Sequence, residues 1–194
     1  MKKEVNINNE QELKKFLKML PIYKSSLYRF VYFELKNDKY NVGKIINALN
    51  LKKRKERLFY IHNEICDMID NEYEGSNLCD FKCNQCRLQR KLNNKQVNGC
   101  CRMCMYNGPR GCTTKNFACK MFYCSEVKEH HEVVKYQNIK LLKMLSLRQR
   151  IILKHAYFCK QDDVINDLYI GSLFIAFIRI PYRIIRNFWF TEKS

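Results

Sequence analysis

Apolar residues recur every three or four positions through the first 72 residues, which is the period of amphipathic helices. Asn8 or Asn9 can cap the first helix, and Pro21 is expected to end it. In the second helix, the tyrosine, phenylalanine and valine residues also suit a strand. The helices predicted in this part cover residues 11–20, 27–36, 42–50 and 52–72.

A second helical part is predicted after Cys124. One helix should begin at Ser125 and continue to a kink near Ser146 or beyond it. Asp162 or Asp163 can then cap an apolar helix that Pro181 is expected to break. Its most apolar stretch, 168–178, is 11 residues long, whereas a bilayer-spanning helix needs about 20. This apolar helix is therefore expected to be buried, with peripheral contact of residues 164–190 to a membrane surface as the alternative.

Between these parts lies a segment of a different kind. Nine of the 11 cysteines fall between Cys79 and Cys124, where glycine and proline supply turns and apolar periodicity is nearly absent. A segment with so little to bury needs another source of folding energy, which bound metal would supply. We predict a mainly α fold, a helical domain with an irregular cysteine-rich metal-binding insertion. Its predicted parts are an N-terminal helical part (1–75), a cysteine-rich module (76–125) and a C-terminal helical part (126–194) that packs on the first.

The cysteines are expected to be metal-binding thiols rather than disulfides. Residues 1–16 lack the apolar core and cleavage site of a secretory signal, so a cytoplasmic location is expected. Disulfides rarely persist in that reducing compartment, where clustered cysteines usually bind metal. The odd number of cysteines also argues against a closed disulfide framework.

Two CxxC pairs have the spacing of a zinc site: Cys83 with Cys86 and, after 14 intervening residues, Cys101 with Cys104. Four thiolates so spaced can surround one zinc ion at about 2.3 Å, although iron–sulfur clusters use the same ligands. A second centre could draw on the remaining cysteines, or on the pair 130–131, whose histidines otherwise lie on an exposed helix face. The cofactor is expected to be one or two zinc ions, with an iron–sulfur cluster as the alternative. The predicted ligands are Cys79, Cys83, Cys86, Cys100, Cys101, Cys104, Cys112, Cys119 and Cys124.

His62 and Cys66 are one helical turn apart, so that they could share a metal ion in principle. Burial in the core is the favoured interpretation, because a cysteine outside a cluster is usually a small buried hydrophobe.

The later cysteines resemble a known pattern. Gly-Cys-Thr at 111–113 and Cys-Lys-Met-Phe at 119–122, following Cys104, are similar to the second half of the zinc- or iron-chelating cysteine-cluster (CxxCxxCC-type) family. The first block of that family would correspond to Cys83, Cys86 and the pair 100–101, in a different arrangement. The resemblance covers about 45 of 194 residues and implies metal chelation without an established reaction.

The spacing Cys79-x3-Cys83-x2-Cys86 is also similar to the CxxxCxxC signature of radical S-adenosylmethionine enzymes. Gln85 replaces the usual aromatic residue of that signature. In addition, the 108 residues that follow Cys86 lack alternating strands and helices and a glycine-rich cofactor segment.

The formal net charge of +17 is concentrated in the cysteine-rich segment, where nine basic residues and one acid give 9 − 1 = +8. These cations could be solvated, could balance metal-bound thiolates, or could bind nucleic acid together with 52–55 and exposed aromatic rings. No catalytic constellation and no small-molecule substrate is indicated. The expected function is a metal-binding cysteine-cluster protein with a structural or sensing role; the alternatives are a basic zinc-containing nucleic-acid-binding protein and an iron–sulfur redox enzyme. The candidate counter-charges are Lys82, Arg87, Arg90, Lys91, Arg102, Lys115 and Lys120.

Overall fold

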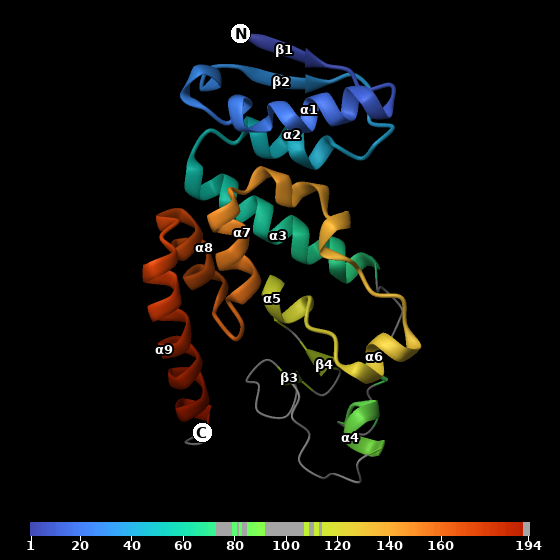
Figure 1. Cartoon of the computed structure of the whole chain (residues 1–194), viewed down its shortest axis with the longest axis vertical. Coiled ribbons are helices and arrows are strands. Elements are labelled where there is room, and N and C mark those ends of the chain that lie inside the picture. Colours follow the sequence, from blue (N-terminus) through green and yellow to red (C-terminus); the bar gives the residue numbers. More distant parts are fainter. Residues whose placement is uncertain are drawn as a thin grey trace.

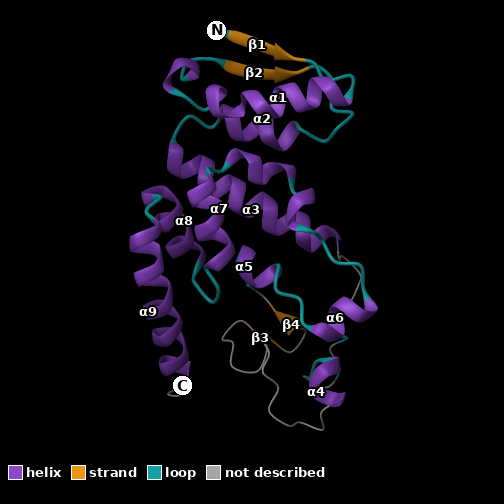
Figure 2. Cartoon of the chain, in the orientation of Figure 1, coloured by secondary structure: helices purple, strands orange, loops and turns teal. Residues whose placement is uncertain are grey.

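The computed structural model describes residues 1–72, 79–80, 82, 85–91, 107–108, 111–112 and 114–191. Over these residues the fold is mainly helical, which confirms the predicted fold class (Figures 1 and 2). The α-helices are α1 (Glu10–Tyr23), α2 (Gly43–Asn50), α3 (Arg54–Glu72), α4 (Arg87–Lys91), α5 (Phe117–Lys120), α6 (Ser125–His130), α7 (Leu147–His155), α8 (Gln161–Ile170) and α9 (Leu173–Thr191). The short elements are the 3₁₀ helices η1 (Ser26–Tyr28), η2 (Tyr136–Asn138) and η3 (Lys140–Met144), and the strands β1 (Lys2–Val5), β2 (Tyr32–Leu35), β3 (Asn107–Gly108) and β4 (Gly111–Cys112).

Helix α3 runs through the middle of the molecule and joins its two ends. Strands β1 and β2 with α1 and α2 lie at one end, and α4, α6 and the β3–β4 hairpin lie at the other (Figure 1). Helices α2, α5 and α8 and the η3 turn all pack against α3. Its buried face includes Leu58, Ile61 and Ile65, as the periodicity predicted. The core therefore unites residues from both helical parts of the sequence.

The first helix begins as predicted but ends later. The side chain of Asn9 accepts a hydrogen bond from the backbone N–H of Glu12 at 2.9 Å, which confirms the cap. Pro21 does not end the helix, because α1 continues to Tyr23. The N–H of Lys24, after the proline, donates to the carbonyl of Leu20, before it. Because Pro21 is exposed, the hydrogen bond that it removes costs less than it would in the core.

The helix predicted over 27–36 is wrong. Residues 26–28 form η1, and 32–35 form β2, which pairs in parallel with β1. Alternation decides the outcome: Val31 and Phe33 are buried, whereas Leu27 and Phe30 on the supposed helical face are each 82% exposed. The side chain of Asn50 completes the strand by donating to and accepting from the backbone of Phe33, at 2.8 Å in both bonds.

The single helix predicted after Ser125 is also wrong. Helix α6 ends at His130, an extended segment follows, and the chain then forms η2 and η3. The break near Ser146 is confirmed, because Ser146 and Gln149 form a capping box that begins α7.

The apolar C-terminal helix is divided where no break was predicted. Lys160, not Asp162 or Asp163, precedes α8, and the two aspartates lie in its first turn. Gly171 ends α8 with φ at +68°, a left-handed conformation that glycine adopts without steric cost. Pro181 lies inside α9 and does not break it.

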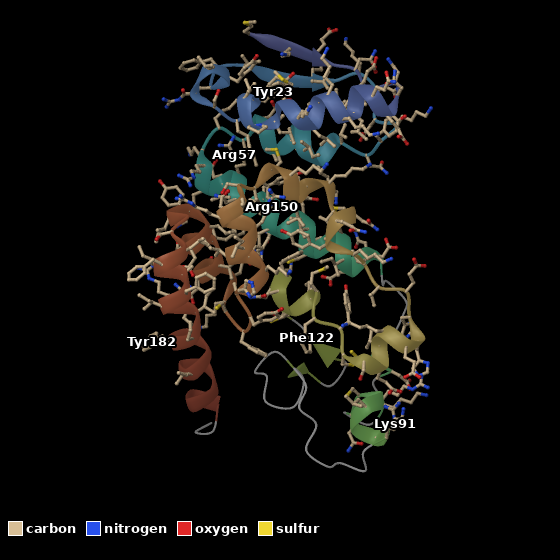
Figure 3. All side chains as sticks on the ribbon, in the orientation of Figure 1. Tyr23, Arg57, Lys91, Phe122, Arg150 and Tyr182 are labelled. Carbon is tan, nitrogen blue, oxygen red and sulfur yellow. The ribbon has the colours of Figure 1, made fainter. Side chains whose placement is uncertain are left out.

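Helix α9 is not buried on all sides. Ala176, Ile180 and Arg183 face inward, and α9 packs against α7. The opposite side is exposed and apolar, and Tyr182 on it points outward in Figure 3. Among the described helices none is long and apolar enough to span a membrane. Contact of this exposed side with a membrane surface stays a prediction. The exposed apolar residues of α9 are Phe174, Phe177, Ile178, Tyr182 and Ile185.

Candidate metal centre

Backbone hydrogen bonds close a turn before α4 and hold the backbone of Cys79 beside the start of that helix. Lys82 and Gln85 form an antiparallel bridge with N–H to carbonyl distances of 2.9 and 3.0 Å, and positions 83 and 84 lie between them in the chain. The N–H of Arg87 donates to the carbonyl of Cys79 at 2.9 Å. Cys79 is therefore held beside the residue that follows Cys86. A short loop between thiols is the local geometry that lets neighbouring cysteines bind one ion.

The side chain of Arg90, on α4, fastens this turn from inside. Its guanidinium donates to the carbonyls of Asp80 and Gln85 at 2.6 and 2.9 Å, and it pairs with the Asp80 carboxylate at 2.5 Å. Burial opposes ionisation of that carboxyl, but hydrogen bonds and ion pairs with Lys82 and Arg90 outweigh it, so the pKa of Asp80 is lowered. Asp80 has a left-handed φ of +44°, which aspartate tolerates better than most residues. Arg90 thus fixes the carbonyls on both sides of the turn.

Glu126 joins α4 to α6. Its carboxylate lies 3.1 Å from the guanidinium of Arg87, 3.2 Å from the ammonium of Lys91 and 3.3 Å from the ring of His130. Its hydrogen bond with Lys91, supported by the charges of Arg87 and His130, lowers the pKa of Glu126. Figure 3 labels Lys91 on α4, at the same end of the molecule as α6.

Two predicted ligands directly precede the helices that Glu126 joins. Cys86 directly precedes α4 and Cys124 directly precedes α6, so Glu126 ties both helix starts to one place. The sequence interpretation placed Glu126 on a solvated face, whereas it is only 6% exposed. In the sequence, the spacing of four residues between Glu126 and His130 was a signal for an ion pair. The partners of Glu126 on α4 gave no such signal, because they are some 35 residues away.

Glu126, Glu129 and His130 also form the group of potential metal ligands that converges in the described part of the chain, with their ligand atoms within 4.8 Å of one another. Arg87 and Lys91 already neutralise Glu126. A metal ion would have to compete with two cations for that carboxylate. We therefore interpret this group as an ion-pair junction.

Asn116 fastens the later cysteines to the helical core. Its side chain, 1% exposed, accepts from the N–H of Cys119 at 3.1 Å and donates to the carbonyls of Ala156 and Cys159 at 2.8 and 2.9 Å. In return, the N–H of Phe158 donates to the sulfur of Cys119 at 3.3 Å. A donor directed at sulfur favours the thiolate form, which is the form that binds metal.

The described cations of this region have carboxylate partners, and their role as counter-charges to thiolates stays a prediction. The acids come from α3 and α6 as well as from Asp80, so the acid count of the segment could not reveal them. Two of these pairs, from Lys115 and Lys120, anchor the segment to α3. Arg102 lies outside the described residues. The pairs are Lys82–Asp80, Arg90–Asp80, Arg87–Glu126, Lys91–Glu126, Lys115–Asp67 and Lys120–Asp70.

The structure describes only some of the predicted ligands. Cys86 is buried, and Cys79, Cys119 and Cys124 are half-buried. Cys112 ends β4, of which the backbone alone is described. The grouping of the first pair with the second therefore stays a prediction. Four predicted ligands lie outside the described residues: Cys83, Cys100, Cys101 and Cys104.

His62 and Cys66 belong to the core, which confirms the favoured interpretation. They are 1% and 0% exposed, and within the described residues neither ring nitrogen of His62 has a hydrogen-bond partner. Burial lowers the pKa of His62 to about 4 and raises the pKa of Cys66 to about 12. Near neutral pH the pair is an uncharged imidazole and a protonated thiol, so Cys66 is not the thiolate that a metal ion requires.

No protein-family model, curated protein or solved structure matches this chain. The resemblance to the cysteine-cluster family therefore stays a prediction.

Proposed function

We propose that the protein binds metal through the cysteines of residues 79–124, in a structural or sensing role. The observation that supports this proposal is the closed turn between Lys82 and Gln85, together with the hydrogen bond from the N–H of Arg87 that holds the carbonyl of Cys79 at the start of α4. Arg90 keeps the turn in place before any ion binds. Such supporting contacts around metal ligands typically change metal affinity 10–100-fold.

The weak packing of the region gives the proposal a thermodynamic reason. Among its described residues from 79 to 124, the buried apolar side chains are those of Cys86, Phe117 and Ala118. Ion pairs join α4 to α6, but ion pairs near a protein surface generally stabilise little. A structural zinc ion contributes on the order of 10 kcal/mol to folding. Metal would therefore supply most of the stability that this region lacks.

Zinc is the proposed metal because thiolates at CxxC spacing suit its tetrahedral coordination. An iron–sulfur cluster uses the same ligands and would make a redox role possible. Elemental analysis and a visible spectrum of anaerobically purified protein distinguish the two. A colourless protein with zinc supports the structural role, whereas an absorbing, iron-containing protein supports the redox alternative.

Site-directed variants test which sulfurs hold the metal. Cys86→Ser and Cys101→Ser should lower the bound metal per chain, measured by elemental analysis after gel filtration. Cys159→Ala is the matched control, because it removes a buried thiol outside the predicted ligand set. An unchanged metal content in both serine variants would refute the proposal.

Nucleic-acid binding is a second candidate function, supported by a groove far from the cysteines. The groove, of about 640 Å³, lies between α1 and η3. The groove is lined mostly by lysines. A row of such cations can follow the phosphate backbone of a nucleic acid, and this kind of binding weakens as the salt concentration rises. Fluorescence anisotropy with a labelled single strand at rising salt tests this. Affinity that does not fall with salt contradicts it. The lining residues are Lys14, Lys15, Leu17, Lys18 and Lys143.

A further inference from the structure

Three cations meet where α1, α3 and α7 converge on the end of η3. Lys24 ends α1, and its ammonium donates to the carbonyl of Met144, the last residue of η3, at 2.8 Å. Arg57 lies in the first turn of α3, which packs on η3, and Arg150 lies in the first turn of α7, just beyond Ser146. Both arginines act on Lys24 electrostatically, and Figure 3 labels them on the facing helices α3 and α7.

These cations have no acid to balance them. Within the described part of the chain, none of the three belongs to an ion pair with a carboxylate, although such pairs are frequent elsewhere in the molecule. Burial, with help from Arg57 and Arg150, lowers the pKa of Lys24 to about 8. Burial and the neighbouring Arg54 also lower the pKa of Arg57. Buried charge without a partner is costly, so an arrangement of this kind normally has an anionic partner.

Two buried donors, one on Arg150 and one beside Lys24 in the chain, also lack acceptors in the described part of the structure. The Nε of Arg150 is shielded from solvent and has no hydrogen-bond partner. The hydroxyl of Ser25, next to Lys24 in the chain, is likewise buried without one. Buried polar atoms are nearly always hydrogen-bonded, so unmatched donors beside unmatched cations indicate a missing acceptor.

We infer that Lys24, Arg57 and Arg150 bind a phosphate group, with the Ser25 hydroxyl as an additional donor. A phosphate carries close to two negative charges and several acceptor oxygens, and the planar forks of two arginines match it better than lysines alone would. The site lies at half-buried side chains on α1, α3 and α7, so it goes beyond the proposed metal function and does not depend on the cysteines.

The same chemistry could come from a small phosphate ion or from a nucleic-acid backbone. The lysine-lined groove also lies where α1 packs on η3, so a chain of phosphates could occupy both places. If the phosphate belongs to a nucleic acid, the inference rests on the proposed nucleic-acid binding. It then deepens that proposal by assigning the phosphate contact to Arg57 and Arg150. The experiment has one arm for each source.

The small-anion arm uses the full chain, with inorganic phosphate and pyrophosphate added at constant ionic strength and the thermal midpoint as the readout. The midpoint should rise with phosphate but not with sodium chloride, because a ligand that binds the folded state stabilises it. Arg57→Gln and Arg150→Gln should each weaken this binding at least about tenfold, since each removes a charged hydrogen bond. Arg148→Gln, an exposed position on the same helix, is the matched control and should bind like the wild type.

The midpoints without ligand separate binding from a structural role. Removing Arg57 or Arg150 relieves repulsion on Lys24, so each glutamine variant should be at least as stable as the wild type in the absence of phosphate. A variant that is less stable without ligand, and still responds to phosphate as the wild type does, overturns the inference.

The nucleic-acid arm uses anisotropy with a labelled single-stranded oligonucleotide. The nucleic-acid backbone is the source of the phosphate if the small anions do not bind but the oligonucleotide does. In that case Arg150→Gln and Lys143→Gln should both weaken binding of the oligonucleotide, whereas Arg148→Gln should not. If neither ligand binds, or if the arginine variants bind both ligands as the wild type does, the inference is wrong.

Discussion

The helical core and the cysteine-rich region are held together in different ways. In the core, side chains such as Ile61, Ile65 and Leu168 are packed to within 1% of full burial. The cysteine-rich region is held together instead by hydrogen-bonded turns, the buried Asn116 and ion pairs. The difference extends to charge. Each described cation between residues 79 and 124 has a carboxylate partner, whereas the half-buried Lys24, Arg57 and Arg150, at the edge of the core, have none among the described residues.

This difference shows what apolar packing permits. A well-packed core can tolerate repulsion between cations, because its stability comes from buried area. A region with little buried area has no such reserve, so its charges must be matched and its remaining stability must come from elsewhere. The comparison therefore leads to metal in one region and to an anion in the other.

The largest expected effect is the loss of one region alone when metal is removed. A chelator under reducing conditions should abolish protection of the α4 and α6 amides against hydrogen exchange, because metal is proposed to supply on the order of 10 kcal/mol there. The amides of α2 and α3 should stay protected by their apolar packing. Cys86→Ser protein should already show the chelated pattern. If chelation leaves both regions equally protected, the comparison fails.

A cavity in the core should be the next largest effect. Ile65→Ala, at a position with 0% exposure, should lower the free energy of unfolding by about 3–4 kcal/mol in a urea titration. Phe59→Ala on the same helix, where Phe59 is 45% exposed, should cost about 1 kcal/mol or less. Similar losses from the two variants would show that buried area does not dominate this part of the protein.

Asn116→Ala should separate the cysteine-rich region from the core at a moderate cost. It leaves the buried carbonyls of Ala156 and Cys159 without their donor, and unmatched buried groups cost about 1–3 kcal/mol each. We expect a loss of about 2–3 kcal/mol in the same titration. Asn138→Ala, at an exposed position, is the control and should change little. A silent Asn116→Ala would show that the two regions are joined by other contacts.

The smallest effect is a difference in how the two regions respond to pH. The pKa of Glu126 is lowered from about 4.5, so its contribution is complete above that pH and is lost as the pH falls through the lower value in the folded state. The pKa of Lys24 is lowered from 10.5 to about 8, so the folded protein should gain stability as the pH rises between these values. Urea titrations of wild type, Glu126→Gln and Lys24→Gln test both signs. The first variant should lack the acid-side loss, and the second should lack the alkaline-side gain.

Local signals were sufficient for several elements. The apolar period located α2 and α3, Asn8 or Asn9 was found as the first cap, and a break was placed near Ser146, because caps and periodicity depend on neighbours in sequence. The same reasoning failed at 27–36, where pairing with β1 favours a strand over a helical period. It also failed at Pro181, where a helix continues through a residue that usually ends one.

The candidate sites were less accessible from the sequence. The cysteine spacing indicated metal chemistry, but the partners of Glu126 and the convergence of Arg57 with Arg150 depend on elements far apart in the chain. Each of those residues looks like an ordinary surface charge when it is considered alone. Their unusual surroundings exist only after α3, α4, α6 and α7 have been brought together.

The contacts of Asn116 impose an order on biosynthesis. A ribosome makes the thiols between Cys79 and Cys124 before it makes Ala156 and Cys159, whose carbonyls lie 40 and 43 residues beyond Asn116. Until then, the segment can form its ion pairs with α3 through Lys115 and Lys120, but it cannot form the hydrogen bonds of Asn116 to these carbonyls. During that interval its sulfur atoms are exposed to oxidants and to competing ions, so a cell that makes this polypeptide gains from delivering the correct ion early.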